Sequence, residues 1–340
     1  MFSDRTAAIT PGYGKPNRNS TMQSAGRAAE WSAMTQRIGF IGLGNLGLHL
    51  ARSLQRTGNP LTITDLNPEI AKSLIADGAS WASTAADVAR ASDVVFTCLP
   101  SPKVIDAVVT GPDGIIAGFA GRPGTWIDMS TNDHNETTRL SAIAAAANVS
   151  MMEAPVTGGV HRAAAAQITV LVGGEDALYE KYADLLGAVG NPVIHMGPVG
   201  SAALIKVITN MLAFINLVGI GEALMLAKRG GLDLGKAFVA IKESSGNSFV
   251  HETEGQVILN GSYNINFTMD LACKDLGFAT QFGRELGVPL DIAGLTEQTF
   301  IRARSQYGGD AWSSQVVKLL EDALGTDLRA PGFPDELPPS

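Results

Sequence analysis

The sequence feature that most constrains the fold is a glycine-rich turn between an apolar run and a leucine-rich run. Residues 37–47 read RIGFIGLGNLG, so a short run with strand propensity leads into Gly42-Leu43-Gly44-Asn45-Leu46-Gly47. The leucines that follow recur at helical spacing. A strand, a tight turn and a helix N-terminus gather free amide groups and the positive end of the helix dipole, which favours a pyrophosphate. The segment therefore predicts a dinucleotide site formed by these six residues.

The three glycines of this turn have separate expected roles. Gly42 allows the tight turn, Gly44 lets the backbone approach a phosphate, and Gly47 lets the helix pack on the strand. This motif indicates a dinucleotide site only within a strand–helix–strand unit. The sequence supplies the second strand, because another apolar run, residues 61–64, follows and ends at Asp65. An acidic residue there accepts hydrogen bonds from ribose hydroxyls and repels a 2′-phosphate, so NAD is predicted over NADP. The alternative is a glycine-rich helix start that binds no ligand.

The composition argues against several classes of protein. A chain of 340 residues with 45% hydrophobic content is long enough for two domains with full cores. The net charge of −8, without a basic cluster, argues against a nucleic-acid partner. Cys98 and Cys273 are the two cysteines, and they form neither a disulfide framework nor a zinc motif. Two cysteines without a disulfide framework fit a reducing, cytoplasmic compartment. The lack of a zinc motif predicts no metal site.

The longest apolar stretch covers residues 207–226 and is long enough to cross a membrane. It follows Lys206 and contains Asn210, Asn216 and Glu222. Polar residues at these positions favour a helix buried between domains or subunits, so no membrane partner is predicted. Because the stretch is apolar on most faces, we expect a homodimer or homotetramer.

The apolar pattern divides the chain into four parts. Residues 1–36 lack apolar periodicity and are predicted to be a disordered tail. Between 37 and 198, strand-like runs alternate with helical patterns, which predicts a Rossmann-type, doubly wound and mainly parallel sheet. Residues 199–325 carry helical patterns alone and predict an all-α domain for substrate binding and oligomerisation. The proline-rich residues 326–340 are predicted to form a loose tail.

Two of the predicted strands indicate where the cofactor would lie. Ligands of open α/β sheets bind at the C-terminal ends of the strands. One strand ends at Leu99-Pro100 and another at Ser130-Thr131. Both pairs of residues are therefore expected to face the cofactor.

Lys206 is the predicted acid–base group. Hydride transfer at an alcohol carbon needs a group that takes or gives the hydroxyl proton. Lys206 enters an otherwise apolar helix, and its i, i+4 spacing to Asn210 puts both side chains on one face. Burial there would lower the lysine pKa toward a useful value. The spacing alone leaves open a lysine whose ammonium simply reaches solvent, and His195 and His251 are weaker candidates for lining the site.

Four motifs resemble the β-hydroxyacid dehydrogenase family, within the 6-phosphogluconate dehydrogenase superfamily. They occur in the family's order, as Ile38–Gly47 (IGFIGLGNLG), Glu153–Gly159 (EAPVTGG), Gly197–Asn210 (GPVGSAALIKVITN) and Lys274–Gly277 (KDLG). The resemblance covers residues 37–321. It implies an NAD-dependent 3-hydroxyacid dehydrogenase acting on CH–OH. Its substrate would be a small hydroxy acid of the 3-hydroxyisobutyrate type, or the matching semialdehyde.

The resemblance also implies roles for individual residues. Lys206 corresponds to the family's catalytic acid–base, and Asn210 to an asparagine that positions the substrate. Thr157, Gly158 and Gly159 correspond to the loop that holds the substrate carboxylate. Cofactor contacts are implied for Leu99, Pro100, Val104 and Thr131, and for Lys274 near the nicotinamide.

Some positions depart from the family's usual pattern. Glu153 stands where the family usually has Asp, and Thr157 stands where it usually has Ser. The added methyl of Thr157 could reshape the pocket, so the exact substrate is not implied. Leu66, beside Asp65, offers no guanidinium for a 2′-phosphate, which again favours NAD. Two alternatives are a catalytically inactive dinucleotide-binding or scaffold homologue and an imine reductase-like enzyme, and the retention of Lys206 counts against both.

Overall fold

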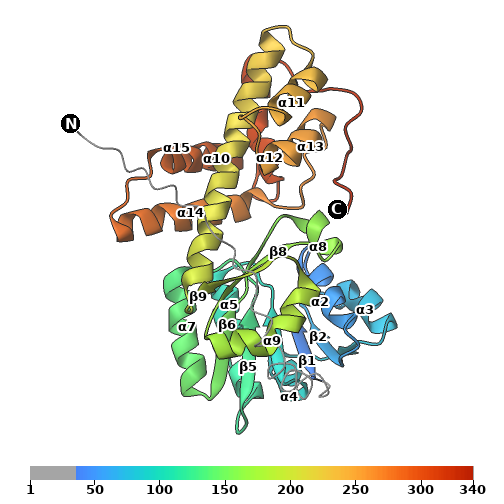
Figure 1. Ribbon diagram of the computed structural model, residues 1–340, viewed down its shortest axis with the longest axis vertical. Coiled ribbons are helices and arrows are strands. Elements are labelled where there is room, and N and C mark those ends of the chain that lie inside the picture. Colours follow the sequence, from blue (N-terminus) through green and yellow to red (C-terminus); the bar gives the residue numbers. More distant parts are fainter. Residues whose placement is uncertain (1–35, 340) are drawn as a thin grey trace, which may run out of the picture. The chain divides into compact units, whose positions relative to one another are not determined.

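The computed structural model describes residues 36–339 (Figure 1), so the predicted disordered tail lies outside the described residues except for Gln36. The first part of the described chain alternates strands with helices. Its elements are β1 (Ile38–Ile41), α2 (Gly47–Gln55), β2 (Leu61–Thr64), the 3₁₀ turn η1 (Pro68–Ala71), α3 (Lys72–Ala76), β3 (Ser80–Trp81), α4 (Ala85–Ala91), β4 (Val94–Thr97), α5 (Pro102–Thr110), α6 (Ile115–Gly118), β5 (Gly124–Asp128), α7 (His134–Ala146), β6 (Val149–Glu153), β7 (Val156–Thr157), α8 (Val160–Ala164), β8 (Thr169–Gly173), α9 (Asp176–Val189) and β9 (Val193–Gly197).

These strands form one mixed sheet with the order β3-β2-β1-β4-β5-β6-β8-β7, and β9 pairs with β8. The strands from β3 to β6 in this order are parallel, with Ile38 of β1 paired to Leu61 of β2 and to Val94 of β4. β8 runs antiparallel to β6 and β7. The chain reverses its direction of winding between β1 and β4, so the ligand crevice of such a sheet lies at their C-terminal ends.

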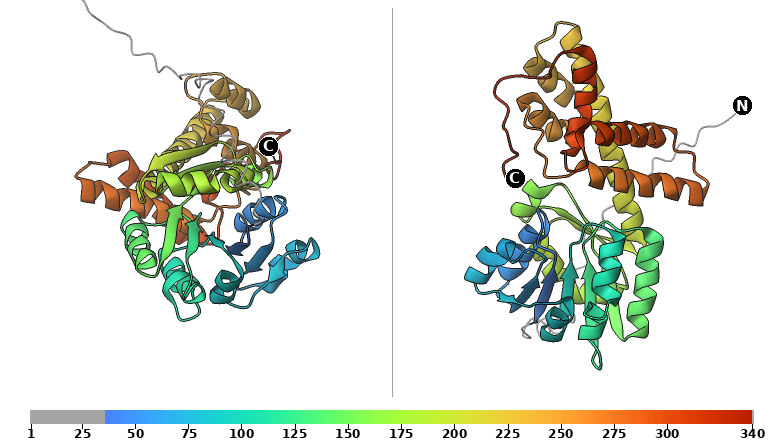
Figure 2. Two further views of the ribbon diagram at one scale, coloured as in Figure 1. Left: turned by 60° about the horizontal axis from the view of Figure 1, so that its bottom comes forward. Right: turned by 180° about the vertical axis from the view of Figure 1, so that it is seen from behind.

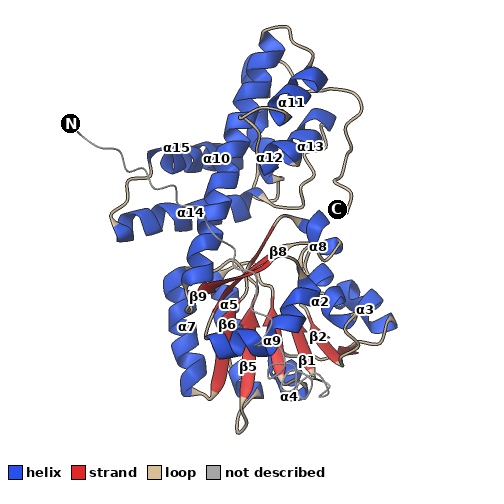
Figure 3. Ribbon diagram, viewed as in Figure 1, coloured by secondary structure: helices blue, strands red, loops and turns tan. Residues whose placement is uncertain are grey.

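Helices cover both faces of the sheet, as Figure 3 shows. Successive residues of β4 point to opposite faces because side chains alternate along a strand. Val94 and Phe96 pack in one core with Leu54 of α2, whereas Val95 packs in a second core with Leu140 of α7. The predicted doubly wound, mainly parallel sheet is therefore confirmed.

The remaining part of the chain is helical. Its elements are α10 (Ser201–Arg229), α11 (Leu234–Lys242), α12 (Phe249–Glu252), α13 (Glu254–Asn260), α14 (Met269–Leu286), α15 (Asp291–Tyr307), the 3₁₀ turn η2 (Ser313–Val317) and α16 (Lys318–Leu324). Within residues 36–339, no strand follows β9 apart from an isolated bridge between Thr268 and Trp312. The rear view in Figure 2 shows the long α10 running through this helical region.

Helix α10 has the length and hydropathy of a membrane span, as the sequence suggested. Its start contacts β8 and β9, and its later turns lie in the helical core. Phe214, Leu217 and Leu224 are buried there, and Phe214 packs edge-on against Phe300 of α15. α10 is therefore a core helix of this fold.

The C-terminal segment, predicted to be a loose tail, contacts the helical region in the structure. Leu328 is fully buried, and Arg329 donates a 3.0 Å hydrogen bond from Nη1 to Glu321 Oε1. Farther along, the Phe333 carbonyl accepts from Asn260 Nδ2 at 2.9 Å. The proline-rich composition disfavours a helix here and lowers the entropy of the unfolded chain.

Candidate active site

The glycine turn of residues 42–47 joins β1 to α2, where the crevice of the sheet lies. Gly42 has a φ of 94°, and a Cβ there would lie 2.4 Å from the Cys98 carbonyl oxygen. A Cβ at Gly47 would lie 2.0 Å from the Gly42 carbonyl oxygen, so the fold itself requires both glycines. A Cβ at Gly44 would meet no atom of the described residues within 4 Å. The fold does not need glycine at this position, which fits a residue kept small for a dinucleotide phosphate.

Asp65 lies at the end of β2 and contacts the glycine turn directly. Its Oδ2 accepts a 2.6 Å hydrogen bond from the Leu43 amide, and its Oδ1 accepts from the Asn67 amide at 2.8 Å. The carboxylate is thus held beside the turn, where a ribose would follow the pyrophosphate. The neighbouring Leu66 is fully exposed and brings no positive charge.

A buried network joins the loops that follow β4 and β5. The Leu99 amide donates to Ser130 Oγ at 2.9 Å, and Ser130 Oγ donates to Asp128 Oδ1 at 2.6 Å. Thr97 Oγ1 donates to the same oxygen at 2.8 Å. Burial raises the pKa of Asp128, although the hydroxyl donors act in the opposite direction. The network holds Leu99-Pro100 beside Ser130-Thr131, whereas Val104 lies in the first turn of α5.

Lys206 lies at the start of a chain of buried polar contacts. Its Nζ donates to Asn210 Oδ1 at 2.8 Å, and Asn210 Nδ2 donates to Asp275 Oδ2 at 2.6 Å. On the same α14 helix, Lys274 Nζ lies 3.2 Å from Asp275 Oδ1 and donates to the Thr131 carbonyl oxygen at 3.0 Å. Helices α10 and α14 and the loop after β5 therefore meet around one line of contacts from Lys206 to Thr131.

Lys206 is buried, and its surroundings lower its pKa. Lys206 is 7% exposed, and burial lowers its pKa to about 8. The Asp275 carboxylate acts in the opposite direction, and the Lys274 ammonium lowers the value further. A lysine of this pKa holds both ammonium and free amine in useful amounts, which suits a general acid–base. The surface lysine left open by the spacing is thereby excluded.

Thr157, Gly158 and Gly159 link β7 to α8. Gly158 and Gly159 have φ values of 127° and 89°, which side-chain-bearing residues rarely adopt. Thr157 pairs with Thr169 on β8, and β7 contacts α10. The loop is thus brought to the helix that carries Lys206, without belonging to the hydrogen-bonded chain from Lys206 to Thr131.

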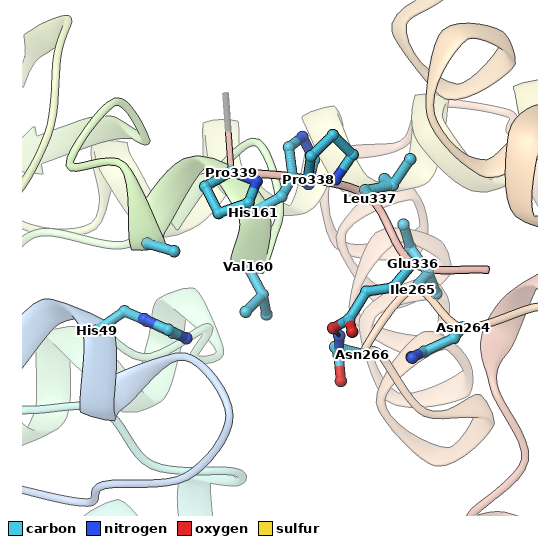
Figure 4. Close-up of a pocket in the computed structure, with 11 residues that line it drawn as sticks. His49, Val160, His161, Asn264, Ile265, Asn266, Glu336, Leu337, Pro338 and Pro339 are labelled. Carbon is cyan, nitrogen blue, oxygen red and sulfur yellow. Dashed lines mark hydrogen bonds between the residues drawn. The ribbon is translucent and has the colours of Figure 1, made fainter. Parts of the chain in front are cut away.

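A cavity of about 360 Å³ lies next to this loop (Figure 4). It is lined by His49 of α2, by Val160 and His161, which directly follow Gly159, and by the C-terminal segment. The opposite wall holds Asn266, whose Nδ2 donates to Glu336 Oε1 at 3.2 Å. Burial lowers the pKa of both His49 and His161, which keeps the two rings neutral near pH 7.

The two weaker histidine candidates have structural roles. His195 Nε2 donates to the Gly174 carbonyl oxygen at 2.9 Å, and its ring stacks on Tyr179. His251 is fully buried and donates from Nε2 to the Phe238 carbonyl oxygen at 2.8 Å. Both rings are held by these contacts, and the side-chain hydrogen bond of Lys206 goes to Asn210 instead.

Sequence reasoning missed two buried acids of the site, Asp128 and Asp275. Asp275 is 1% exposed and connects Asn210 to Lys274. Its signal in the sequence is its place beside Lys274 in the KDLG motif. Asp128 ends a strand-like run and carries no comparable signal, because only the fold reveals that Thr97 and Ser130 meet it.

A glycine turn at the crevice of a doubly wound sheet, combined with a buried lysine of lowered pKa, defines a dinucleotide-dependent dehydrogenase. Comparisons with known proteins agree with this class. Residues 37–197 match the model of the NAD binding domain of 6-phosphogluconate dehydrogenase, and residues 200–320 match that of the NAD-binding domain of NADP-dependent 3-hydroxyisobutyrate dehydrogenase. The chain belongs to the β-hydroxyacid dehydrogenase family, whose members oxidise CH–OH groups.

Individual relatives span almost the whole chain. The chain is 33% identical to 2-(hydroxymethyl)glutarate dehydrogenase of Eubacterium barkeri, over 86% of this chain and 97% of the relative. It is 32% identical to mitochondrial 3-hydroxyisobutyrate dehydrogenase of Rattus norvegicus, over 84% and 87%. A solved structure of 3-hydroxyisobutyrate dehydrogenase from Salmonella typhimurium superposes with a TM-score of 0.77 at 28% identity, covering 84% of this chain and 99% of that one. An imine reductase from Myxococcus stipitatus, at 17% identity and a TM-score of 0.57, shares the fold alone.

Proposed function

We propose that this protein catalyses reversible hydride transfer between NAD and the alcohol carbon of a small 3-hydroxy acid of the 3-hydroxyisobutyrate type. The observation that carries the proposal is the buried Lys206, hydrogen-bonded to Asn210 and shifted to a pKa of about 8. When bound, NAD accepts or returns the hydride. The free amine of Lys206 takes the hydroxyl proton in oxidation, and its ammonium returns the proton in reduction.

The other site residues bind and orient in this proposal. Gly42 to Gly47 and Asp65 would hold the cofactor, together with Leu99, Pro100, Val104, Thr131 and Lys274. Thr157, Gly158 and Gly159 would hold the substrate carboxylate, because their backbone amides precede α8 in a conformation that favours an anion. Asn210 would orient the substrate hydroxyl toward Lys206, since its own position is fixed by Asp275.

The proposal is tested by a screen of hydroxy acids and semialdehydes with NAD and with NADP. Relatives of this chain are named for different substrates, and they include a 3-hydroxyisobutyrate dehydrogenase, an L-threonate dehydrogenase and an L-serine dehydrogenase. The panel should therefore include 3-hydroxyisobutyrate, L-threonate and L-serine. Turnover of at least one 3-hydroxy acid is expected. A protein that binds NAD but oxidises none of them would support the inactive homologue instead. We also propose a cytoplasmic location, from the two free cysteines.

We expect NAD to be preferred over NADP by at least about tenfold in kcat/KM, a difference of about 1.4 kcal/mol. The Asp65 carboxylate repels a 2′-phosphate, and Leu66 cannot pair with one. The double variant Asp65→Asn, Leu66→Arg should reverse the preference, because the amide keeps an acceptor for the Leu43 amide while the guanidinium binds the phosphate. Leu66→Arg alone is the control for the added charge. A wild-type preference for NADP would overturn the assignment.

We expect a homodimer or homotetramer in solution. Leu212 and Leu226 of α10 are 50% and 75% exposed, and Ile292 and Leu295 of α15 are 64% and 72% exposed. Large apolar side chains exposed on the surfaces of α10 and α15 favour association. Light scattering should therefore give a mass of at least twice 35.5 kDa. Leu226→Glu should weaken the assembly if α10 forms the interface, whereas a wild-type monomer at micromolar concentration would contradict the expectation.

A further inference from the structure

Glu153, the last residue of β6, holds the start of helix α10. Its side chain is 3% exposed. Its Oε1 accepts hydrogen bonds from the Gly200 amide at 2.6 Å and from the Ala202 amide at 2.8 Å, and its Oε2 accepts from Ala203 at 3.0 Å. The first amides of a helix have no partner within the helix. One carboxylate therefore satisfies three backbone donors at the start of α10.

The surroundings are shaped around this carboxylate. A Cβ at Gly173, the residue paired with Glu153 across β6 and β8, would lie 2.2 Å from Glu153 Oε1. Gly200 has a φ of 97°, and its carbonyl oxygen accepts from His134 Nδ1 of α7 at 2.9 Å. A side chain at Gly200 would meet the His134 ring, whereas one at Gly173 would meet the Glu153 carboxylate, so it is Gly173 that makes room for Glu153.

Glu153 connects the two halves of the candidate site. Along the chain, it precedes Thr157 of the proposed carboxylate loop by four residues. Through its hydrogen bond to the Ala203 amide, it fixes a point three residues before Lys206, a distance of about 4.5 Å along the helix axis. We propose that Glu153 is a positioning residue that sets Lys206 relative to the substrate loop by holding the first turn of α10.

The carboxylate of Glu153 is costly to bury but accepts from three backbone amides, which agrees with a positioning role. Burial raises the pKa of Glu153 to about 7, and the nearby Asp128 carboxylate acts in the same direction, against the three amide donors. The ionised form is therefore costly to bury here. An apolar residue would avoid that cost but would leave the amides of Gly200, Ala202 and Ala203 without their acceptor, and a neutral glutamine would keep only one of the two acceptor oxygens.

The inference rests on the proposed role of Lys206, and its test includes a readout that is independent of catalysis. In Glu153→Gln, the amide nitrogen cannot accept a hydrogen bond, so the α10 start loses part of its anchor while the side chain keeps its size. Glu153→Asp keeps the charge and restores most of the contact. Asp233→Asn is the matched control, because Asp233 caps α11 through the Lys236 amide at 2.8 Å, outside the site.

We expect Glu153→Gln to lower kcat by about 10- to 100-fold, the scale of a small misplacement of a catalytic group. The KM for NAD should stay near the wild-type value, and amide hydrogen exchange should rise in residues 200–206. Glu153→Asp should recover most of kcat, and Asp233→Asn should leave kcat unchanged. Wild-type kcat in folded Glu153→Gln, or a kcat loss matched by an equal loss of NAD binding, would overturn the inference. If no hydroxy acid is turned over, unchanged exchange in residues 200–206 would still overturn it.

Discussion

Lys206→Met is expected to lower kcat by about 10²- to 10⁴-fold, the usual contribution of a general acid–base group. Methionine keeps much of the length and the apolar contacts of the lysine, but it carries no proton. NAD binding should be nearly unchanged, because the proposed cofactor contacts lie on the sheet, the glycine turn and Lys274. Steady-state kinetics with the best substrate and a direct NAD titration measure the two effects separately.

Lys206→Arg is the control for charge. The guanidinium keeps the positive charge but cannot release its proton in this pH range, so kcat should fall as well. If Lys206→Arg keeps the positive charge but loses kcat, the loss of activity is due to proton transfer and not to charge. If Lys206→Met retains more than about a tenth of wild-type kcat, a loss well below that of a general acid–base, Lys206 does not move the proton.

Gly44→Val should weaken NAD binding by about 10- to 100-fold without loss of the fold. A Cβ at Gly44 meets no described atom within 4 Å, so the free protein has room for the first carbon of the side chain. The same side chain would keep a phosphate from the backbone amides of the turn. Losing a charge-assisted hydrogen bond costs about 1.5–3 kcal/mol, and each 1.4 kcal/mol is about tenfold in affinity. Calorimetric titration with NAD and a melting curve test both parts.

Gly47→Ala is the matched substitution in the same turn. Its Cβ would lie 2.0 Å from the Gly42 carbonyl oxygen, so the backbone must shift and the melting temperature should fall. A Gly44→Val variant that binds NAD like the wild type would contradict the assignment of the turn to the pyrophosphate. Equal destabilisation by the two substitutions would show that both glycines serve the fold alone.

The parts of the fold that the sequence predicted are those fixed by local patterns. The glycine turn, the alternation of strands and helices up to β6, and the long α10 are each encoded within a few neighbouring residues. The antiparallel pairing of β8 with β6 and β7 depends instead on contacts between distant segments, and β7 has only two residues. Short elements such as α8 and α12 carry too few residues for a periodic pattern.

In the site, too, the sequence predicted the residues that local patterns reveal and missed those that only distant contacts bring together. Lys206 and Asn210 are visible because polar residues stand out on an apolar helix, and their i, i+4 contact is local. Asp275 lies 65 residues from Asn210 in the chain, so only the packing of α14 against α10 shows that it completes the contact. Leu328 shows the same dependence, because its burial depends on the fold around Glu321 and not on its proline-rich neighbourhood.

The central claim, that Lys206 exchanges the proton, is tested most directly by the pH dependence of kcat in both directions. Burial lowers the Lys206 pKa to about 8. Oxidation needs the free amine, so its rate should rise with pH through an ionisation near that value and then level off. Glu153, whose pKa is raised to about 7, should add a separate rise at lower pH. Reduction needs the ammonium, so its rate should fall over the same range.

The same profile should be measured for Lys206→Met as the reference. We expect the ionisation near pH 8 in the wild type and its loss from the residual activity of Lys206→Met. An oxidation rate that does not change with pH between about 6.5 and 9.5, or a variant that keeps the same ionisation, would contradict proton transfer by Lys206.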